Sequence, residues 1–252
     1  LLMTQQSRVV FAGQGIPMTT DLRDEFPLAN YIRLKLSEGD VQACYLESDQ
    51  EFRDGPIAIV AHGNAETIGH WSEIAKSLHK TGLSLLLVEY PGYGGSAGEP
   101  SEATIAETFD QAYAWLETNH DLSQRKIIGL GRSLGSGPIV ELAARHRIDG
   151  LVLFSPFSSL SRMAWGMGAP GFLLKTRYDN VKALKPFQGP TLLVHGAKDH
   201  IISPSHSERL ARVNERVTLR RVDTGHNDLW DASEAVIGHL KTWLAESDLW
   251  KG

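Results

Sequence analysis

A serine between glycines, at the junction of a strand and a helix, is the residue in this sequence best suited to nucleophilic chemistry. Ser133 is the centre of Gly-Arg-Ser-Leu-Gly at 131–135, a G-x-S-x-G pattern. An apolar run at 126–130 precedes the pattern, and a stretch of helical character at 139–145 follows it. The serine is therefore expected on a sharp, strained nucleophile elbow, where glycines let strand and helix approach closely. Free N–H groups at the helix start would favour an oxyanion, so the position suits acyl transfer.

A second G-x-S-x-G match is centred on Ser96. The preceding strand is predicted to end at Tyr90, and Glu99-Pro100 delays the next helix. Ser96 is therefore expected in an ordinary loop rather than on an elbow.

The glycines around Ser133 also permit a rival interpretation. Gly129, Gly131 and Gly135 have the spacing of a loose dinucleotide-binding loop. Such a loop usually lies in the first βαβ unit and is followed by an acid at the end of the next strand. The next predicted strand, at 150–154, has no acid at its end, which disfavours a nucleotide site.

A serine hydroxyl needs a base to take its proton, and the base needs an acid to hold its tautomer. His226 follows a predicted strand at 217–222 and precedes the last helical stretch. Asp199 follows a predicted strand at 191–195. The resulting order Ser133, Asp199, His226 is the order of one known class of catalytic triad, and it predicts these three roles.

Two other assignments of the same residues stay open. Asp223 or Asp228 could orient the histidine, although each lies so near it in sequence that the chain would have to fold back. His195 and His200 could bind a metal with Asp199, but no further cysteine or carboxylate lies at ligand spacing. The sequence therefore implies neither a metal nor a cofactor.

An oxyanion hole needs two N–H donors. One is expected from Leu134, the residue after the nucleophile. The second is expected from the loop after the strand at 57–61, with the Asn64 N–H as the choice and Ala65 as the alternative. His62, in the same loop, is expected to brace the turn rather than to act as a base.

Short apolar runs alternate with amphipathic stretches and must position these groups. The runs lie at 57–61, 84–90, 126–130, 150–154, 191–195 and 217–222. Several are apolar on both faces, as strands of a parallel sheet covered by helices must be. The helical stretches lie at 68–78, 105–116 and 229–244, with a helix start signal at Ser101.

Before residue 57 the pattern changes to an antiparallel hairpin, at 31–36 and 41–46, on the edge of the sheet. Repeats and linkers are absent from the sequence, which predicts a single α/β domain over residues 1–252, with a short cap at about 156–189. The cap carries large apolar residues that are predicted to line a substrate pocket: Met163, Trp165, Met167 and Phe172. The same residues could equally well pack the cap onto the sheet. A short roof suits short to medium acyl chains.

Composition removes other classes of function. The 252 residues are 42% hydrophobic and 22% charged, which is globular rather than disordered. With 25 Lys and Arg against 30 Asp and Glu, the formal charge of −5 gives no net attraction to nucleic acid. A single cysteine, Cys44, rules out an internal disulfide.

The longest apolar runs, such as 57–61 and 85–88, are far shorter than the ~20 residues of a membrane span. A chain that opens Leu1-Leu2-Met3 fits the removal of an upstream signal peptide or anchor, and fits an ordinary internal start equally well. The sequence leaves oligomeric state open. It favours the cytoplasm, with a periplasmic or membrane-tethered location as the alternative if an upstream segment was removed.

Over residues 30–245 the chain resembles the α/β-hydrolase superfamily. The resemblance is to a branch of small-cap serine hydrolases related to the abhydrolase-domain depalmitoylases and to many uncharacterised esterases. The segments that carry it are His62-Gly63-Asn64-Ala65, Tyr90-Pro91-Gly92-Tyr93-Gly94, Gly98-Glu99-Pro100-Ser101-Glu102, Gly131-Arg132-Ser133-Leu134-Gly135 and His226-Asn227-Asp228. It implies an α/β-hydrolase fold with a mostly parallel sheet, an antiparallel amino-terminal edge and helices on both faces. Members often carry an amino-terminal membrane anchor.

The residues and the resemblance together predict a serine hydrolase that cleaves a carboxylic ester of short to medium acyl chain through an acyl-enzyme on Ser133. The expected partner is a small-molecule ester or thioester, and an acyl-protein or lipid thioesterase is the alternative. A peptidase fits less well because no residues remain for a substrate-gating domain. A non-catalytic binding protein on the same fold would be expected to lack a triad member, and none is missing.

Overall fold

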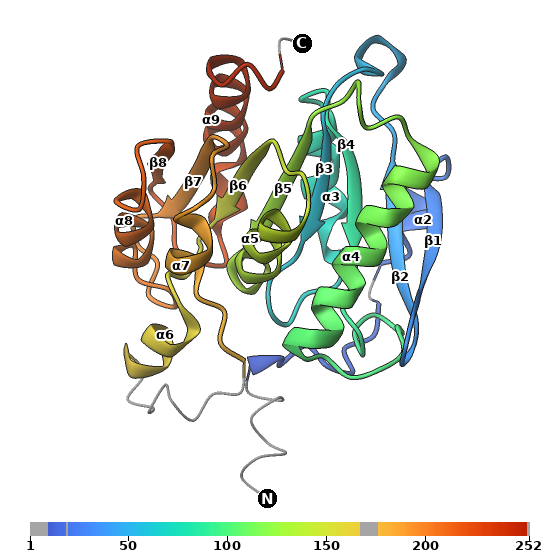
Figure 1. The fold of residues 1–252 in the computed structure, drawn as a ribbon, viewed down its shortest axis with the longest axis horizontal. Coiled ribbons are helices and arrows are strands. Elements are labelled where there is room, and N and C mark those ends of the chain that lie inside the picture. Colours follow the sequence, from blue (N-terminus) through green and yellow to red (C-terminus); the bar gives the residue numbers. More distant parts are fainter. Residues whose placement is uncertain (1–9, 19, 167–175, 251–252) are drawn as a thin grey trace, which may run out of the picture.

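The structure is a computed structural model that describes residues 10–18, 20–166 and 176–250, the side chains of 165 and 166 excepted. Within these residues the chain forms one eight-stranded sheet covered by helices on both faces (Figure 1). The strand order is β1-β2-β4-β3-β5-β6-β7-β8. The strands are β1 Asn30–Leu36, β2 Gly39–Leu46, β3 Ile57–Ala61, β4 Ser84–Val88, β5 Ile127–Arg132, β6 Gly150–Phe154, β7 Thr191–Gly196 and β8 Val217–Val222.

Six of these strands, from β4 to β8 in the sheet order, run parallel. The hairpin of β1 and β2 adds the antiparallel edge, with Leu34 opposite Val41 and Ala43 opposite Val88. The predicted α/β-hydrolase architecture is therefore confirmed. Several strand ends differ from the prediction by one or two residues; in particular, β4 stops at Val88, and β5 continues through the elbow glycine to Arg132.

Successive residues of each central strand enter two separate cores, because side chains alternate between the faces of a sheet. In β3, Ile57 and Ile59 pack into the core under α4 (Glu102–Asn119) and α5 (Ser136–Arg145). Ala58 and Val60 pack into the core under α3 (Ser72–His79) and α9 (Ser233–Glu246). The helices are α2 Leu22–Glu25, α3 Ser72–His79, α4 Glu102–Asn119, α5 Ser136–Arg145, α6 Leu160–Gly166, α7 Asn180–Leu184, α8 Ser205–Ala211 and α9 Ser233–Glu246. Within the described residues no helix is long and apolar enough to cross a membrane.

The start of α4, the helix before β5, is fixed by a capping motif in the sequence. Ser101 caps α4: its hydroxyl accepts from the Thr104 N–H at 3.1 Å, and the Thr104 hydroxyl accepts from the Ser101 N–H at 3.0 Å. This reciprocal capping box confirms the predicted helix start.

The carboxyl ends of the parallel strands carry the loops of interest (Figure 1). Helices α6 and α7 lie in the segment predicted as a cap, next to that edge. Residues 167–175 of the same segment lie outside the described part of the chain.

Candidate active site

The elbow at the end of β5 is built by steric requirements. Ser133 has φ of 52°, a left-handed conformation that costs a non-glycine residue on the order of 1–3 kcal/mol. A Cβ on Gly131 would lie 2.6 Å from the Gly135 carbonyl oxygen, and one on Gly135 would lie 2.1 Å from the Ala61 carbonyl oxygen. Both positions must therefore be glycine for β5, α5 and the end of β3 to meet.

Three side chains from three loops form a hydrogen-bonded chain at this edge. The Ser133 Oγ lies 3.0 Å from His226 Nε2, and His226 Nδ1 lies 2.7 Å from Asp199 Oδ2. All three residues are buried. With Nδ1–H donating to the carboxylate, Nε2 is left as the acceptor for the serine O–H. The structure thus brings together the serine, acid and histidine that were predicted from chain order.

Asp199 is held ionised by its surroundings. Burial alone would raise the pKa of its carboxyl group, but hydrogen bonds from His195, His226 and the Ile202 N–H outweigh burial and hold the pKa well below its usual range. Asp199 Oδ1 accepts from the Ile201 N–H at 2.9 Å and from the Ile202 N–H at 2.8 Å. These donors fix the carboxylate before it meets the histidine.

His195 is a second histidine on the same carboxylate. Its Nε2 lies 3.2 Å from Asp199 Oδ2 and 2.8 Å from the Ile202 carbonyl oxygen, and its Nδ1 lies 2.6 Å from the Ser207 hydroxyl. Sequence reasoning considered His195 only as a metal ligand. Its position at the end of β7, four residues before Asp199, was the signal that could have placed it beside the acid.

Asp223 and Asp228, the alternative acids, make no hydrogen bond to His226 among the described contacts, whereas Asp199 does. Asp223 pairs with Lys198 at 2.9 Å on the surface, and Asp228 lies at the start of a 3-10 turn. The Ser96 hydroxyl accepts from the Gln42 N–H at 3.1 Å, in a loop. Among the described residues there is no group of three or more His, Cys, Asp or Glu placed to hold a metal.

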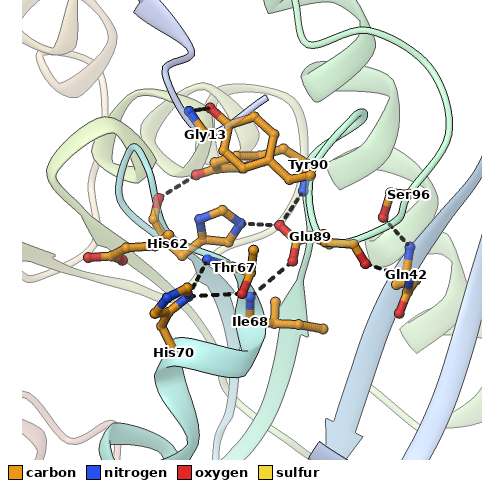
Figure 2. A network of polar contacts seen from close by, with 12 residues as sticks. Gly13, Gln42, His62, Thr67, Ile68, His70, Glu89, Tyr90 and Ser96 are labelled. Carbon is orange, nitrogen blue, oxygen red and sulfur yellow. Dashed lines mark hydrogen bonds and ion pairs between the residues drawn. The ribbon is translucent and has the colours of Figure 1, made fainter. Parts of the chain in front are cut away.

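The loop after β3 is braced by a buried hydrogen-bonded pair, His62 and Glu89 (Figure 2). His62 Nε2 lies 2.6 Å from Glu89 Oε1, and His62 Nδ1 lies 2.9 Å from the Gly63 carbonyl oxygen. Glu89 also accepts from the Ile68 N–H at 3.0 Å and the Tyr90 N–H at 3.1 Å. Every ring nitrogen of His62 is engaged away from Ser133, which fits the predicted bracing role. Glu89, at the end of β4, was missed.

The same loop carries the two amides weighed as oxyanion donors. The Ala65 N–H donates to the Asn64 side-chain oxygen at 3.0 Å, whereas the Asn64 N–H has no acceptor among the described residues. The Asn64 side-chain amide donates to the Val10 carbonyl oxygen at 2.9 Å, and its oxygen accepts from the Tyr93 hydroxyl at 3.1 Å. Leu134 follows Ser133 in the short 3-10 turn Ser133–Gly135, where N–H groups lack helical partners.

The four predicted pocket residues are only partly described. Met163 lies on α6 and packs against a small cluster of Phe157, Leu160, Tyr178 and Ile202. Trp165 lies on the same helix by its backbone. Met167 and Phe172 lie outside the described residues. The contacts of Met163 are those of a residue that packs the cap, so the pocket role stays a prediction.

Comparisons with known proteins agree with the fold. A family model described as serine aminopeptidase, S33, matches residues 55–180. An uncharacterised protein of Mycobacterium tuberculosis is 35% identical over 183 residues, which make up 69% of this chain and 64% of that protein. Alpha/beta hydrolase domain-containing protein 17B of Xenopus laevis is 30% identical over 193 residues, covering 75% of this chain and 66% of that protein.

The matched segment therefore spans just under two thirds of the length of these relatives. Among solved structures, an esterase of Pyrococcus furiosus superposes with a TM-score of 0.73 at 18% identity, covering 92% of this chain and 95% of the other. At that identity the likeness concerns the fold alone.

Proposed function

Because the chain belongs to the α/β-hydrolase superfamily and is a hydrolase by fold and family, we propose that it is a serine hydrolase acting on carboxylic esters of short to medium acyl chain. One observation carries this proposal. The Ser133 hydroxyl, the His226 ring and the Asp199 carboxylate form a continuous buried hydrogen-bonded chain with distances of 3.0 and 2.7 Å. That arrangement is the one that activates a serine hydroxyl for acyl transfer.

In the first half-reaction His226 Nε2 takes the proton of Ser133 as its oxygen attacks the acyl carbon. A tetrahedral intermediate forms, and its oxygen is negatively charged. The imidazolium then gives the proton to the leaving alcohol, the bond from the acyl carbon to that oxygen breaks, and an ester on Ser133 remains. Water attacks this acyl-enzyme by the same route, with His226 first as base and then as acid, and releases the carboxylic acid.

Asp199 supports each step without changing its own protonation. Its depressed pKa keeps it a carboxylate throughout the neutral range, so it holds the histidine tautomer with Nε2 free and stabilises the imidazolium when that forms. The Leu134 N–H and the Asn64 N–H are proposed as the oxyanion donors. The Asn64 N–H has no acceptor among the described residues, whereas the Ala65 N–H already donates to the Asn64 side-chain oxygen. This difference favours the Asn64 N–H as the second donor.

Labelling with a fluorophosphonate probe tests the nucleophile. We expect one labelled serine, Ser133, and loss of labelling in Ser133→Ala. Ser96→Ala, which removes the serine of the second G-x-S-x-G pattern, is the matched control and should label at the wild-type rate. Label on Ser96, or undiminished labelling of Ser133→Ala, would overturn the assignment.

A substrate screen tests the reaction class. Nitrophenyl esters from acetate to palmitate should give a kcat/KM that rises to butyrate or hexanoate and then falls, because each buried methylene contributes up to about 0.8 kcal/mol until a short pocket is full. A palmitoyl thioester and an amino-acid nitroanilide belong in the same screen. Preference for the thioester would favour the thioesterase alternative, and preference for the anilide would favour the peptidase named by the matching family model.

A further inference from the structure

We propose that Arg132 and Glu66 are positioning residues that lock the three loops of the site together, a role that rests on the proposed function. Arg132 directly precedes the nucleophile, and Glu66 lies in the loop that offers the Asn64 N–H. Neither residue touches the Ser133 hydroxyl in the described contacts. Each acts through the backbone of a loop that carries a reacting group.

The contacts of this pair reach all three loops. The Arg132 guanidinium forms an ion pair with Glu66 through Nη1 and donates to the His226 carbonyl oxygen from Nη2 at 2.9 Å. The other carboxylate oxygen of Glu66 accepts from the Gly63 N–H at 2.8 Å and from the Trp71 indole N–H at 3.0 Å. One buried pair therefore joins the elbow, the His226 loop and the amide next to that of Asn64.

Burial makes this pair rigid and costly to break. The side chain of Arg132 is 6% exposed and that of Glu66 is 19% exposed. Desolvation lowers the pKa of the Arg132 guanidinium, and the Asp199 charge opposes that shift. A charge removed from water in this way is stable only with its partner in place, so both side chains hold one geometry.

Gly63, in the loop after β3 that contains Asn64, is packed so closely against the ion pair that this part of the loop has little room to move. A Cβ on Gly63 would lie 3.0 Å from Arg132 Nη1 and 3.1 Å from the Glu66 carboxyl group. Gly63 thus lies directly against the ion pair, and the peptide from Gly63 to Asn64 begins at this residue. Loss of either charge would let this peptide move relative to Ser133, and misplacement by about 1 Å can cost on the order of 10²-fold in rate.

A matched variant at the other end of the same strand separates positioning from stability. Arg125 precedes β5, is 9% exposed, and pairs with Glu47 at 2.8 Å far from the elbow. Arg132→Met and Arg125→Met each remove one buried guanidinium. We expect both to lower Tm, but only Arg132→Met to lower kcat, by about 10- to 100-fold at a KM within about two-fold of wild type. Arg132→Lys keeps the charge but not the fork that reaches two partners, and should recover part of kcat.

The rate constant for fluorophosphonate labelling of Ser133 gives a readout that needs no known substrate. It should fall in Arg132→Met and in Glu66→Gln, by similar factors, and no further in the double variant. Wild-type labelling rates in both single variants would overturn the positioning role, as would an equal loss in Arg125→Met. Absence of any label on wild-type Ser133 would instead overturn the proposed function. Should Arg132→Met fail to fold, Glu66→Gln and Arg132→Lys decide the question.

A separate observation carries a second proposal: we infer that a basic groove between α6, α7 and α8 binds a phosphate group. The groove has a volume of about 590 Å³ and is lined by Arg162, Lys185, Arg209 and Arg212. None of these four side chains has a hydrogen-bond or ion-pair partner among the described residues. The residues outside the described part contain no aspartate or glutamate to pair with them.

The charge of the groove runs against that of the whole chain. The protein carries a formal charge of −5, yet the one acid lining the groove, Glu208, is already paired with Arg221. Four unpaired like charges around one concave surface repel each other, and an anion relieves that repulsion. The exposed Ser205 hydroxyl lies in the same lining and adds a neutral donor. Arginine forks suit a phosphate group, carried either by a small molecule or by a lipid headgroup.

Inorganic phosphate and vesicles distinguish these sources. At constant ionic strength, phosphate should raise the Tm of wild type more than chloride does, and Arg209→Gln/Arg212→Gln should abolish the difference. Arg216→Gln/Arg220→Gln removes two charges outside the groove lining and is the matched control. Sedimentation with phosphatidylglycerol vesicles, but not with phosphatidylcholine vesicles, would assign the phosphate to a lipid. No effect of either probe, or equal effects in both double variants, would overturn the site.

Discussion

Replacement of Gly135 by alanine tests how tightly the elbow is built into the sheet. Gly135 has φ of −60° and ψ of −16°, a conformation that suits alanine. Any effect of the substitution therefore comes from the steric clash of the new Cβ and not from backbone strain. The new Cβ would lie 2.1 Å from the Ala61 carbonyl oxygen and 2.7 Å from the His62 carbonyl oxygen, and real Cβ contacts do not fall below 3.0 Å. Moving from 2.1 to 3.0 Å requires a shift of at least 0.9 Å between α5 and the end of β3.

Both segments that would have to move apart carry groups of the proposed site. Ser133 precedes Gly135 by two residues, and Ala61 directly precedes the loop with Asn64. Displacement on this scale is expected to cost about 10²-fold in kcat/KM. The overpacking itself should cost about 1–3 kcal/mol of the free energy of unfolding. For a protein of this size each kcal/mol corresponds to about 2–4 °C in Tm.

The assay pairs a nitrophenyl ester rate with thermal unfolding. Gly238→Ala is the control, because Gly238 lies inside α9 and a Cβ there would meet nothing within 4 Å. That substitution should raise stability by about 0.5–1 kcal/mol through helix propensity and leave kcat/KM unchanged. A Gly135→Ala protein with the Tm and kcat/KM of wild type would refute the steric argument.

Three further predictions concern titratable groups. Asp199→Asn should lower kcat/KM by about 10⁴-fold. Since the pKa of Asp199 is depressed from 3.8, its contribution to stability is present above about pH 4 and is lost as the pH falls further. Urea unfolding at pH 7 and at pH 3 should therefore show that the difference in free energy of unfolding between wild type and Asp199→Asn is smaller in acid. Burial, and then the Glu102 charge, raises the pKa of Glu141 from 4.5 to about 7. The Tm of wild type should therefore fall as the pH rises through that range. The Tm of Glu141→Gln, which has no carboxyl group to ionise there, should not show this fall. Burial raises the pKa of the Cys44 thiol to about 12, so it should resist Ellman's reagent until denaturant is added, and rapid reaction of the native protein would contradict this.

The parts of the fold that follow local patterns were predictable from sequence. Strands β3 and β6 were placed at their observed bounds, because continuous apolar runs of five residues can be buried on both faces only in a covered sheet. The residues Ser133, Asp199 and His226 could be brought together from chain order alone, since parallel strands deliver their carboxyl ends to one edge.

The supporting contacts were not predictable in the same way. Glu89 meets His62 across 27 positions, and Arg132 meets the His226 carbonyl oxygen across 94. No periodicity or short motif encodes such pairs, because they depend on side-chain directions at loop bases after the sheet has formed. A buried carboxylate ending an apolar strand, as Glu89 does after β4, was the available hint: such a charge needs a partner, and the nearest loop supplies it.

The placement of His226 after the last strand has a consequence for the chain during its synthesis. Ser133 and His226 are 93 residues apart, which at about 5–20 residues per second separates their translation by about 5–20 s. Throughout that interval the nascent chain carries the proposed nucleophile without its proposed base, so we expect it to be unable to turn over acyl groups. β7 also remains an open edge until β8 pairs with it, and an open edge invites association with other chains. β8 therefore covers the edge of β7 and becomes the new edge shortly before the proposed base His226 is added, and we expect a chain stalled before residue 217 to lack both the base and the cover on β7.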